Sequence, residues 1–230
     1  MTSVHRLPAR ERRKAILQAV KRVFAAKGFD GATTRELAEA AGVSEALLYK
    51  HFPSKESLYE AMRDDCVHDP ALNHFWRVME LDPSTSTLVL LVHALVQKML
   101  VDSGEAEPSG DLFPVLALRS LLDDGAFVRI MTELFAERWL PKFRACVKAA
   151  RVAGDVEAGG VRPDLAGLFV HNLAAMMMFQ ALPSKPVVDY RSTPNELVSS
   201  VVVFTLRGVG LKEAAIRRHY NPKALALLAA

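Results

Sequence analysis

Several features are scarce in this sequence, and each scarcity excludes a class of protein. Two cysteines, Cys66 and Cys146, occur in 230 residues, too few for a disulfide framework and in keeping with a reducing compartment. Glycine and proline number 12 each, which excludes collagen-like and low-complexity chains. The first residues are charged with no apolar stretch behind them, so no secretory signal is expected. Because 50% of the residues are hydrophobic, we expect one or two domains with sizeable cores.

The net charge of +3 conceals an uneven distribution of charge along the chain. Residues 1–55 hold 11 of the 29 lysines and arginines but 5 of the 26 acids, a net charge of +6. The other 175 residues carry a net charge of −3. A basic first quarter is typical of a surface that meets a polyanion such as nucleic acid, although solvated basic segments are also common in other proteins.

The hydrophobic pattern is helical almost throughout. No run of alternating apolar residues is bounded by turn pairs such as Asn-Gly, so we expect almost no strand and an all-α fold. Polar loops are expected over residues 104–111 and 154–163. The helices are predicted over residues 10–27, 33–41, 45–52, 55–67 (or on to 79, past Pro70), 86–102, 114–124, 126–153, 164–182, 194–208 and 211–219, the last ended by Asn221-Pro222.

Residues 165–184 carry no charge, and a run of 20 residues is long enough to span a membrane. However, the run contains His171, Asn172 and Gln180, and no second run of comparable length exists in the sequence. We therefore expect no membrane span here but a buried helix, enclosed by other helices of this chain or of a partner.

Local signals divide the first 52 residues into three helices with a tight turn before the third. Thr33 and Glu36 have the spacing of a capping box, which predicts a helix start at Thr33. Gly42 permits a sharp turn, and Ser44 is a good N-cap for the helix that follows. This arrangement is typical of a helix-turn-helix unit.

The third helix separates an inward face from an outward face. Leu48 and Phe52 lie four residues apart and are expected to point inward. Ser44 leaves the helix start able to face a phosphate, and Arg35 has the geometry to reach guanine in the major groove. The other outward residues are Glu45, Ala46, Tyr49 and Lys50, and the side chains of a type that contacts phosphate are Tyr49, Lys50, His51 and Lys55.

One segment of the sequence resembles a known protein family. The stretch from residue 33 to residue 58 reads TTRELAEAAGVSEALLYKHFPSKESL. It looks like the DNA-binding domain of the TetR family of bacterial transcriptional regulators, and the likeness covers roughly residues 10–60. The rest of the chain resembles that family only in its length and its helical layout.

The resemblance implies a role for each matching residue. Thr33, Thr34 and Arg35 match the helix start that meets DNA. The residues that match the base-facing and groove-facing positions are Glu45, Ala46, Leu47 and Lys50, and those that match the phosphate clamp are Tyr49, His51 and Lys55. The family often has Gly-Thr or Pro-Thr where this chain has Ala46-Leu47, and Leu47 is able to pack only on a thymine methyl. Taken alone, Tyr49 also suits a core aromatic, and His51 a buried structural histidine.

We predict a DNA-binding domain over residues 1–55 and a helical domain over 56–230, with the helix at 55–67 as connector. By resemblance, the second domain forms a homodimer and holds a small ligand. Helices 164–182 and 194–208 are the most uniformly apolar and are predicted to form the dimer interface, although both also suit the core of a monomer. Whether residues 211–230 join that interface is left open. The small residues expected to allow close approach are Gly167, Ala174, Ala175, Ser199 and Ser200.

The ligand pocket is predicted from polar, aromatic and methionine side chains set within apolar helices. Each of them also suits ordinary core packing, and a mostly apolar ligand is expected. The candidates are His93, Gln97, Arg119, Met131, Phe135, Trp139, His171, Asn172 and Met177.

Catalytic and metal-binding chemistry finds little support in the sequence. Nucleotide-binding, nucleophile-elbow and Cys-x-x-Cys motifs are absent, so we expect no enzyme, no cofactor and no metal. His68, Asp69 and His74 lie close in sequence, but with no cysteine partner and Pro70 between them we expect no metal site there. The sequence predicts a cytoplasmic, homodimeric repressor that binds double-stranded operator DNA and is released by a small effector. Alternatives are a ligand-controlled activator and an enzyme with a vestigial DNA-binding domain.

Overall fold

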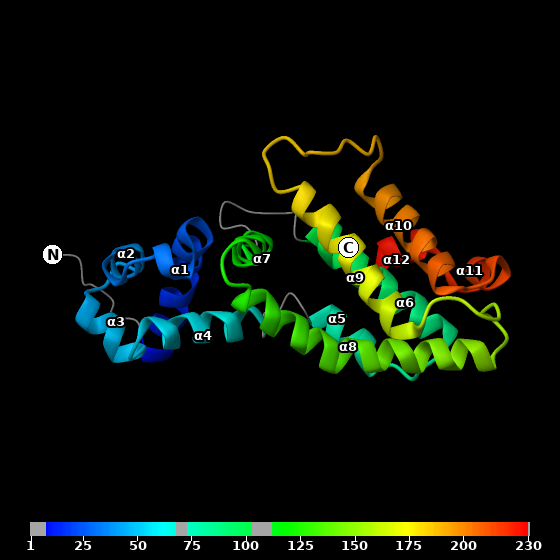
Figure 1. Ribbon diagram of the computed structural model, residues 1–230, viewed down its shortest axis with the longest axis horizontal. Coiled ribbons are helices and arrows are strands. Elements are labelled where there is room, and N and C mark those ends of the chain that lie inside the picture. The colour runs from blue at the N-terminus through cyan, green and yellow to red at the C-terminus, as the bar shows by residue number, and fades with distance from the viewer. Residues whose placement is uncertain (1–7, 68–72, 103–111, 230) are drawn as a thin grey trace. The chain divides into compact units, whose positions relative to one another are not determined.

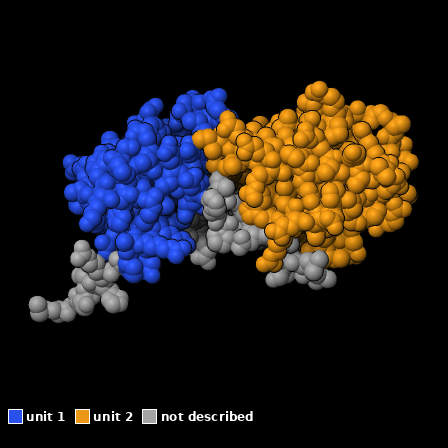
Figure 2. Space-filling view, turned by 90° about the horizontal axis from the view of Figure 1, so that it is seen from below, with its two compact units in different colours: residues 1–70, 115–129 blue, residues 71–114, 130–230 orange. Residues whose placement is uncertain are grey.

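The computed structural model describes residues 8–67, 73–102 and 112–229, and these residues are almost entirely helical (Figure 1). The chain divides into two compact units, coloured in Figure 2: residues 1–70 with 115–129, and residues 71–114 with 130–230. In the described ranges, the strand-type pairing is limited to one isolated β-bridge between Val156 and Leu211. The predicted all-α fold, with an N-terminal helix-turn-helix domain and a larger helical domain, is confirmed.

The first unit is built around a three-helix core. Helix α1 contacts α2 and α4, and α2 contacts α3. Leu48 and Phe52 are each 2% exposed, which confirms that they point inward. The helices of this unit are α1 (Ala9–Gly31), α2 (Thr34–Ala40), α3 (Glu45–His51) and α4 (Lys55–Val67), joined by residues 115–129 from α7 (Phe113–Leu122) and the start of α8 (Ala126–Val152).

The predicted helix starts of this unit are present in atomic detail. The Thr33 hydroxyl accepts a hydrogen bond from the Glu36 amide at 3.3 Å, and the Thr33 amide donates to the Glu36 carboxylate at 3.1 Å. The Ser44 hydroxyl accepts from the amide of Leu47 at 3.2 Å. Gly42 has φ 64°, the left-handed conformation that the tight turn between α2 and α3 requires.

The first helix is interrupted at Gly28, where the sequence predicts its end. Gly28 has non-helical backbone, with φ 72° and ψ 179°, and α1 resumes past this kink only as far as Gly31. A Cβ atom at Gly28 would lie 2.3 Å from Oδ2 of Asp123 on the segment after α7. Both the kink and the close approach of Asp123 therefore require a glycine at position 28. Only the kink could be expected from the sequence.

The second unit surrounds helix α6. Helix α6 contacts α5, α9, α10 and α11, and Leu88, Val89, Leu91 and Val92 on it are completely buried. The elements are α5 (Asn73–Glu80), α6 (Thr85–Gln97), the π-helical turn η2 (Lys98–Asp102), most of α8, α9 (Pro163–Gln180), α10 (Pro194–Val209), α11 (Glu213–His219) and α12 (Pro222–Ala229).

One prediction for this unit was wrong in detail. The helix expected over 86–102 is α-helical only to Gln97, after which η2 follows. The helix predicted over 211–219 does end at His219, before Asn221-Pro222, and Pro222 then begins α12, since proline is favoured at the first helical position, where no amide donor is needed. The predicted loop at 104–111 and the continuation past Pro70 fall outside the described residues, apart from α5 itself.

None of the described helices is long and apolar enough to cross a membrane. Helix α9, which contains most of the uncharged run, buries one side in the unit through residues such as Val170 and Met177. Gly167 and Ala174 were expected to allow close approach of a second copy. They are instead buried within the unit, where Gly167 packs on Trp139 and Leu140 of α8.

Asp155 joins distant parts of the second unit. Its side chain is only 9% exposed, accepts a hydrogen bond from the Thr85 hydroxyl at 2.7 Å, and pairs with Arg218 of α11. Its backbone carbonyl accepts from the Lys212 amide at 2.9 Å. The hydrogen bond from Thr85, with that from Arg218, holds the pKa of Asp155 below its ordinary value, so this carboxylate stays charged.

Candidate nucleic-acid interface

Helix α3 presents a polar outward face from a firmly held backbone. Glu45, Ala46, Tyr49 and Lys50 are exposed, and Leu47 is half-buried. Tyr49 is 43% exposed, so it is no core aromatic. Its hydroxyl lies 3.1 Å from the Thr34 hydroxyl at the start of α2, a contact that fixes the two helices relative to each other.

Arg13 of α1 holds the end of α3, although sequence reasoning gave it no role. Its guanidinium lies 4.1 Å from the centroid of the Phe52 ring, and its Nη1 donates to the backbone carbonyl of His51 at 2.8 Å. The imidazole of His51 is half-buried beside that ring. An arginine that caps a helix end from another helix has no local sequence signal, so this contact could not be predicted.

Arg35 stands on the outer surface of α2. Its Nε donates to Oε1 of Glu39, one turn on, at 2.9 Å, and this hydrogen bond and charge raise the pKa of Arg35 further. The bond uses Nε and leaves the two terminal nitrogens for an outside acceptor. Thr33 and Thr34 directly precede Arg35 at the start of the same helix, so the three predicted residues lie together.

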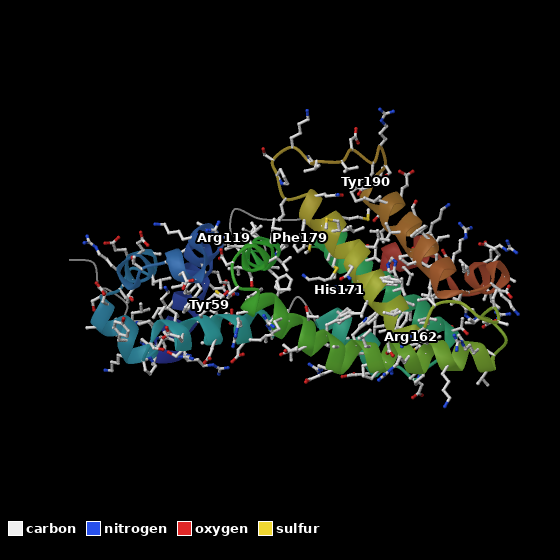
Figure 3. All side chains as sticks on the ribbon, viewed as in Figure 1. Tyr59, Arg119, Arg162, His171, Phe179 and Tyr190 are labelled. Carbon is white, nitrogen blue, oxygen red and sulfur yellow. The ribbon has the colours of Figure 1, made fainter. Side chains whose placement is uncertain are left out.

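Lys55 is positioned by an aromatic cluster. Its Nζ lies 4.4 Å from the centroid of the Phe29 ring, and that ring packs edge-on against Tyr59 at 5.0 Å between centroids. Tyr59, labelled in Figure 3, also contacts Phe24, and burial raises its pKa to about 12, so it stays neutral. The ammonium of Lys55 is thus held against an aromatic face rather than free in solvent.

The structure brings part of the predicted ligand-binding set together in the second unit. Phe135 and Trp139 of α8 stack at 4.7 Å between ring centroids, and the His171 ring of α9 lies 4.4 Å from that of Phe135. Burial lowers the pKa of His171, so its imidazole is neutral at pH 7. Trp139 is 1% exposed, and within the described residues its indole Nε1 has no hydrogen-bond partner.

The other ligand candidates are dispersed. Arg119 belongs to the first unit, where it pairs with Asp123, and Asn172 is exposed beside His171. The Nδ1 of His93 lies 3.5 Å from the Tyr220 hydroxyl. Met177 is buried in the main core, whereas Gln97 and Met131 are half-buried. That these residues bind a ligand stays a prediction.

A surface hollow of about 600 Å³ lies at the loop between α8 and α9, near Arg162 in Figure 3. None of the predicted ligand residues lines this hollow, which is bounded by Arg151 and by residues 156–163. Within the described part of the chain, no three His, Cys, Asp or Glu side chains gather as metal ligands would. The side chains of His68, Asp69 and His74 lie outside the described residues.

The first unit thus defines a class of domain: a helix-turn-helix whose second and third helices expose a polar face. Residues 16–62 match the family described as bacterial regulatory proteins, tetR family. The predicted resemblance to the TetR family is thereby confirmed for this segment.

Two curated relatives extend the likeness. A stretch of 86 residues is 35% identical to nucleoid occlusion factor SlmA of Vibrio vulnificus (strain YJ016), covering 37% of this chain and 43% of that protein. A stretch of 58 residues is 47% identical to the HTH-type transcriptional activator FasR of Mycolicibacterium smegmatis, covering 25% of this chain and 26% of that protein. The chain therefore spans less than half the length of these curated relatives.

The fold likeness covers more of the chain. The crystal structure of NalD, the secondary repressor of the MexAB-OprM multidrug efflux pump in Pseudomonas aeruginosa, has a TM-score of 0.65 at 20% identity. It covers 89% of this chain and 98% of NalD. The second unit thus shares the helical architecture of that structure, while its sequence has diverged.

Proposed function

We propose that this protein is a DNA-binding transcriptional regulator of the bacterial cytoplasm. The observation that carries the proposal is the polar face of α2 and α3, on which Arg35, Tyr49 and Lys50 stand exposed on helices whose opposite sides are buried. A helix so held is suited to the major groove, where arginine reads guanine and the flanking hydroxyl and ammonium groups contact phosphate. The domain boundary at residue 55, with the following helix as connector, belongs to the same proposal.

The direct test is selection of bound fragments from the source genome by the full-length protein, followed by gel-shift titration of the recovered duplexes. We expect a near-palindromic site whose two halves are about one helical turn apart, roughly 34–36 Å. Recovery of fragments without a shared sequence would contradict a sequence-specific role.

The homodimer is part of this proposal. Helices α9 and α10 each bury one side in the unit and leave large apolar side chains on the other. Phe169, Met176 and Phe204 are 57%, 56% and 67% exposed. Exposed apolar groups on two neighbouring helices suit an isologous contact with a second copy, since monomeric proteins rarely display such a face.

We further propose that a small, mostly apolar ligand controls DNA binding, with the aromatic group around Phe135 and Trp139 as its site. In a repressor the ligand lowers operator affinity, with a coupling of typically 5- to 150-fold. The likeness of a 58-residue stretch of this chain to the activator FasR keeps the ligand-controlled activator as a second candidate. An enzyme with a vestigial DNA-binding domain finds no support in the described side chains, and we propose no catalytic role.

Replacement of Arg35 with alanine is expected to lower affinity for the specific site by roughly 10- to 100-fold, because a guanine contact is lost. Gel-shift titration against the selected site and against single-base variants measures the effect. The matched control is Glu39→Ala, which frees Arg35 from its ion pair and leaves the guanidinium in place. Equal affinity of Arg35→Ala and the unmodified protein would remove Arg35 from the base-reading residues.

Replacement of Lys55 with alanine is expected to weaken binding to all duplexes alike, because a phosphate contact carries no sequence information. The slope of log affinity against log salt should become shallower by about one, since one fewer counterion is released. Titrations at several salt concentrations, with specific and unrelated duplexes, measure this slope. A loss confined to the specific duplex would contradict the clamp role.

A further inference from the structure

Helix α7 and the residues after it hold the kinked end of α1. Nη2 of Arg119 donates a long hydrogen bond of 3.4 Å to the backbone carbonyl of Lys27, and its Nε lies 3.5 Å from Oδ2 of Asp123. The same Asp123 oxygen is the atom that would lie 2.3 Å from a Cβ at Gly28. Arg119, shown in Figure 3, thus links a carboxylate after α7 to the turn at the end of α1.

A single side chain, that of Glu36, connects the turn at Lys27 and Gly28 to the start of α2. Nζ of Lys27 lies 2.5 Å from Oε1 of Glu36, while Oε2 of Glu36 accepts the Thr33 amide in the capping box. The hydrogen bond from Lys27, with those from Thr33, lowers the pKa of Glu36 to about 2. One carboxylate therefore joins the end of α1 to the helix start that carries Thr33, Thr34 and Arg35.

We propose that Arg119 is a positioning residue for DNA binding. It fixes the turn at Lys27 and Gly28, and the Lys27–Glu36 pair transmits that position to the first turn of α2. Arginine suits this task because its planar guanidinium reaches a carbonyl and a carboxylate at once. This inference rests on the proposed function, and it moves Arg119 from the predicted ligand site to the support of the DNA face.

The test compares Arg119→Gln with Arg129→Gln in the full-length protein. Arg129 lies in the same unit, and in the described part of the chain its side chain makes no hydrogen bond or ion pair, so its variant removes equal charge without removing this contact. We expect Arg119→Gln to lower affinity for the selected operator about five-fold, because the turn at Lys27 and Gly28 is no longer held in the position that presents the start of α2. Affinity for an unrelated duplex and the thermal unfolding midpoint should match those of Arg129→Gln.

A double-mutant cycle with Glu36→Gln tests the route. Glutamine at this position keeps the capping box but removes the charge pair with Lys27. If Arg119 acts through that pair, Arg119→Gln should have little further effect in the Glu36→Gln background, so the two changes are not additive. Full additivity would overturn the proposed route, and equal losses on both duplexes with a lowered midpoint would reduce Arg119 to a general structural role.

The two proposals fail in different ways. If the unmodified protein selects no preferred duplex, the proposed function fails. If the unmodified protein does select one and Arg119→Gln binds it as tightly as Arg129→Gln does, only the inference about Arg119 fails.

Discussion

A protein carrying Met176→Glu and Phe204→Glu is expected to be monomeric and to bind its operator at least about 100-fold more weakly. Both side chains are exposed on the face of α9 and α10 proposed to meet a second copy. Burial of four unpaired carboxylates in a two-fold apolar interface costs far more than such a contact provides. Without the dimer, one half-site remains, and most of the specific affinity is lost.

Light scattering measures the mass, which should be near 25.3 kDa for the variant, while gel-shift titration measures the affinity. Val152→Glu is the matched control, since Val152 is an exposed apolar residue of the same unit, at the end of α8. It should leave both mass and affinity unchanged. A double variant that stays dimeric would show that these helices do not form the interface.

Trp139→Ala is expected to lower the free energy of unfolding by about 3–5 kcal/mol. The indole is stacked between Phe135 and Phe143, with ring centroids 4.7 Å away on each side. A Cβ at Gly167 of α9 would lie 3.0 Å from the indole, so α8 and α9 meet closely here. An alanine leaves a void that these helices cannot close without losing their other contacts. Urea and thermal unfolding of the second unit measure the loss.

Trp139→Phe provides the control for this prediction. Phenylalanine keeps most of the ring stack, and no hydrogen bond of Nε1 within the described residues is lost, so the cost should be about 1–2 kcal/mol. The same variant removes a donor that an effector is able to use, which makes it the variant of choice for effector titrations. If Trp139→Ala unfolds like the unmodified protein, the aromatic stack is no part of the stabilising core.

Local signals explain how much of the fold could be predicted. The capping box at Thr33 acts within four residues, so the start of α2 follows from sequence and is confirmed. The helix predicted over 194–208 likewise begins at Pro194, where the structure has a capping box at Thr193. The π-helical turn at Lys98–Asp102 depends on how that segment packs against α9 and α10, and sequence carries no signal for it. The pair Asn221-Pro222 predicts a helix end, which α11 confirms at His219, whereas the start of α12 at the same proline depends on the residues that follow it.

In the candidate site, too, features with a local sequence signal could be predicted, and features that depend on distant residues could not. The four-residue spacing of Leu48 and Phe52 fixed which side of α3 faces outward, so the exposed set followed from helical geometry. The position of Arg119 in an apolar helix predicts a ligand contact, whereas its hydrogen bond to the carbonyl of Lys27 joins residues 92 positions apart and has no local sequence signal. The sequence predicts only a capping role for Glu36, because its second partner, Lys27, lies on another helix.

Asp155 has a practical consequence for how the chain can be shortened. Its carboxylate is held by Thr85 at the start of α6 and by Arg218 of α11, while its backbone accepts the amide of Lys212. Truncation before α11 would remove Arg218 and leave the buried carboxylate of Asp155 without its ion-pair partner, next to α6. Fragments designed for crystallisation or ligand screening should therefore extend at least through His219, and an affinity tag is better placed beyond that residue than within α11.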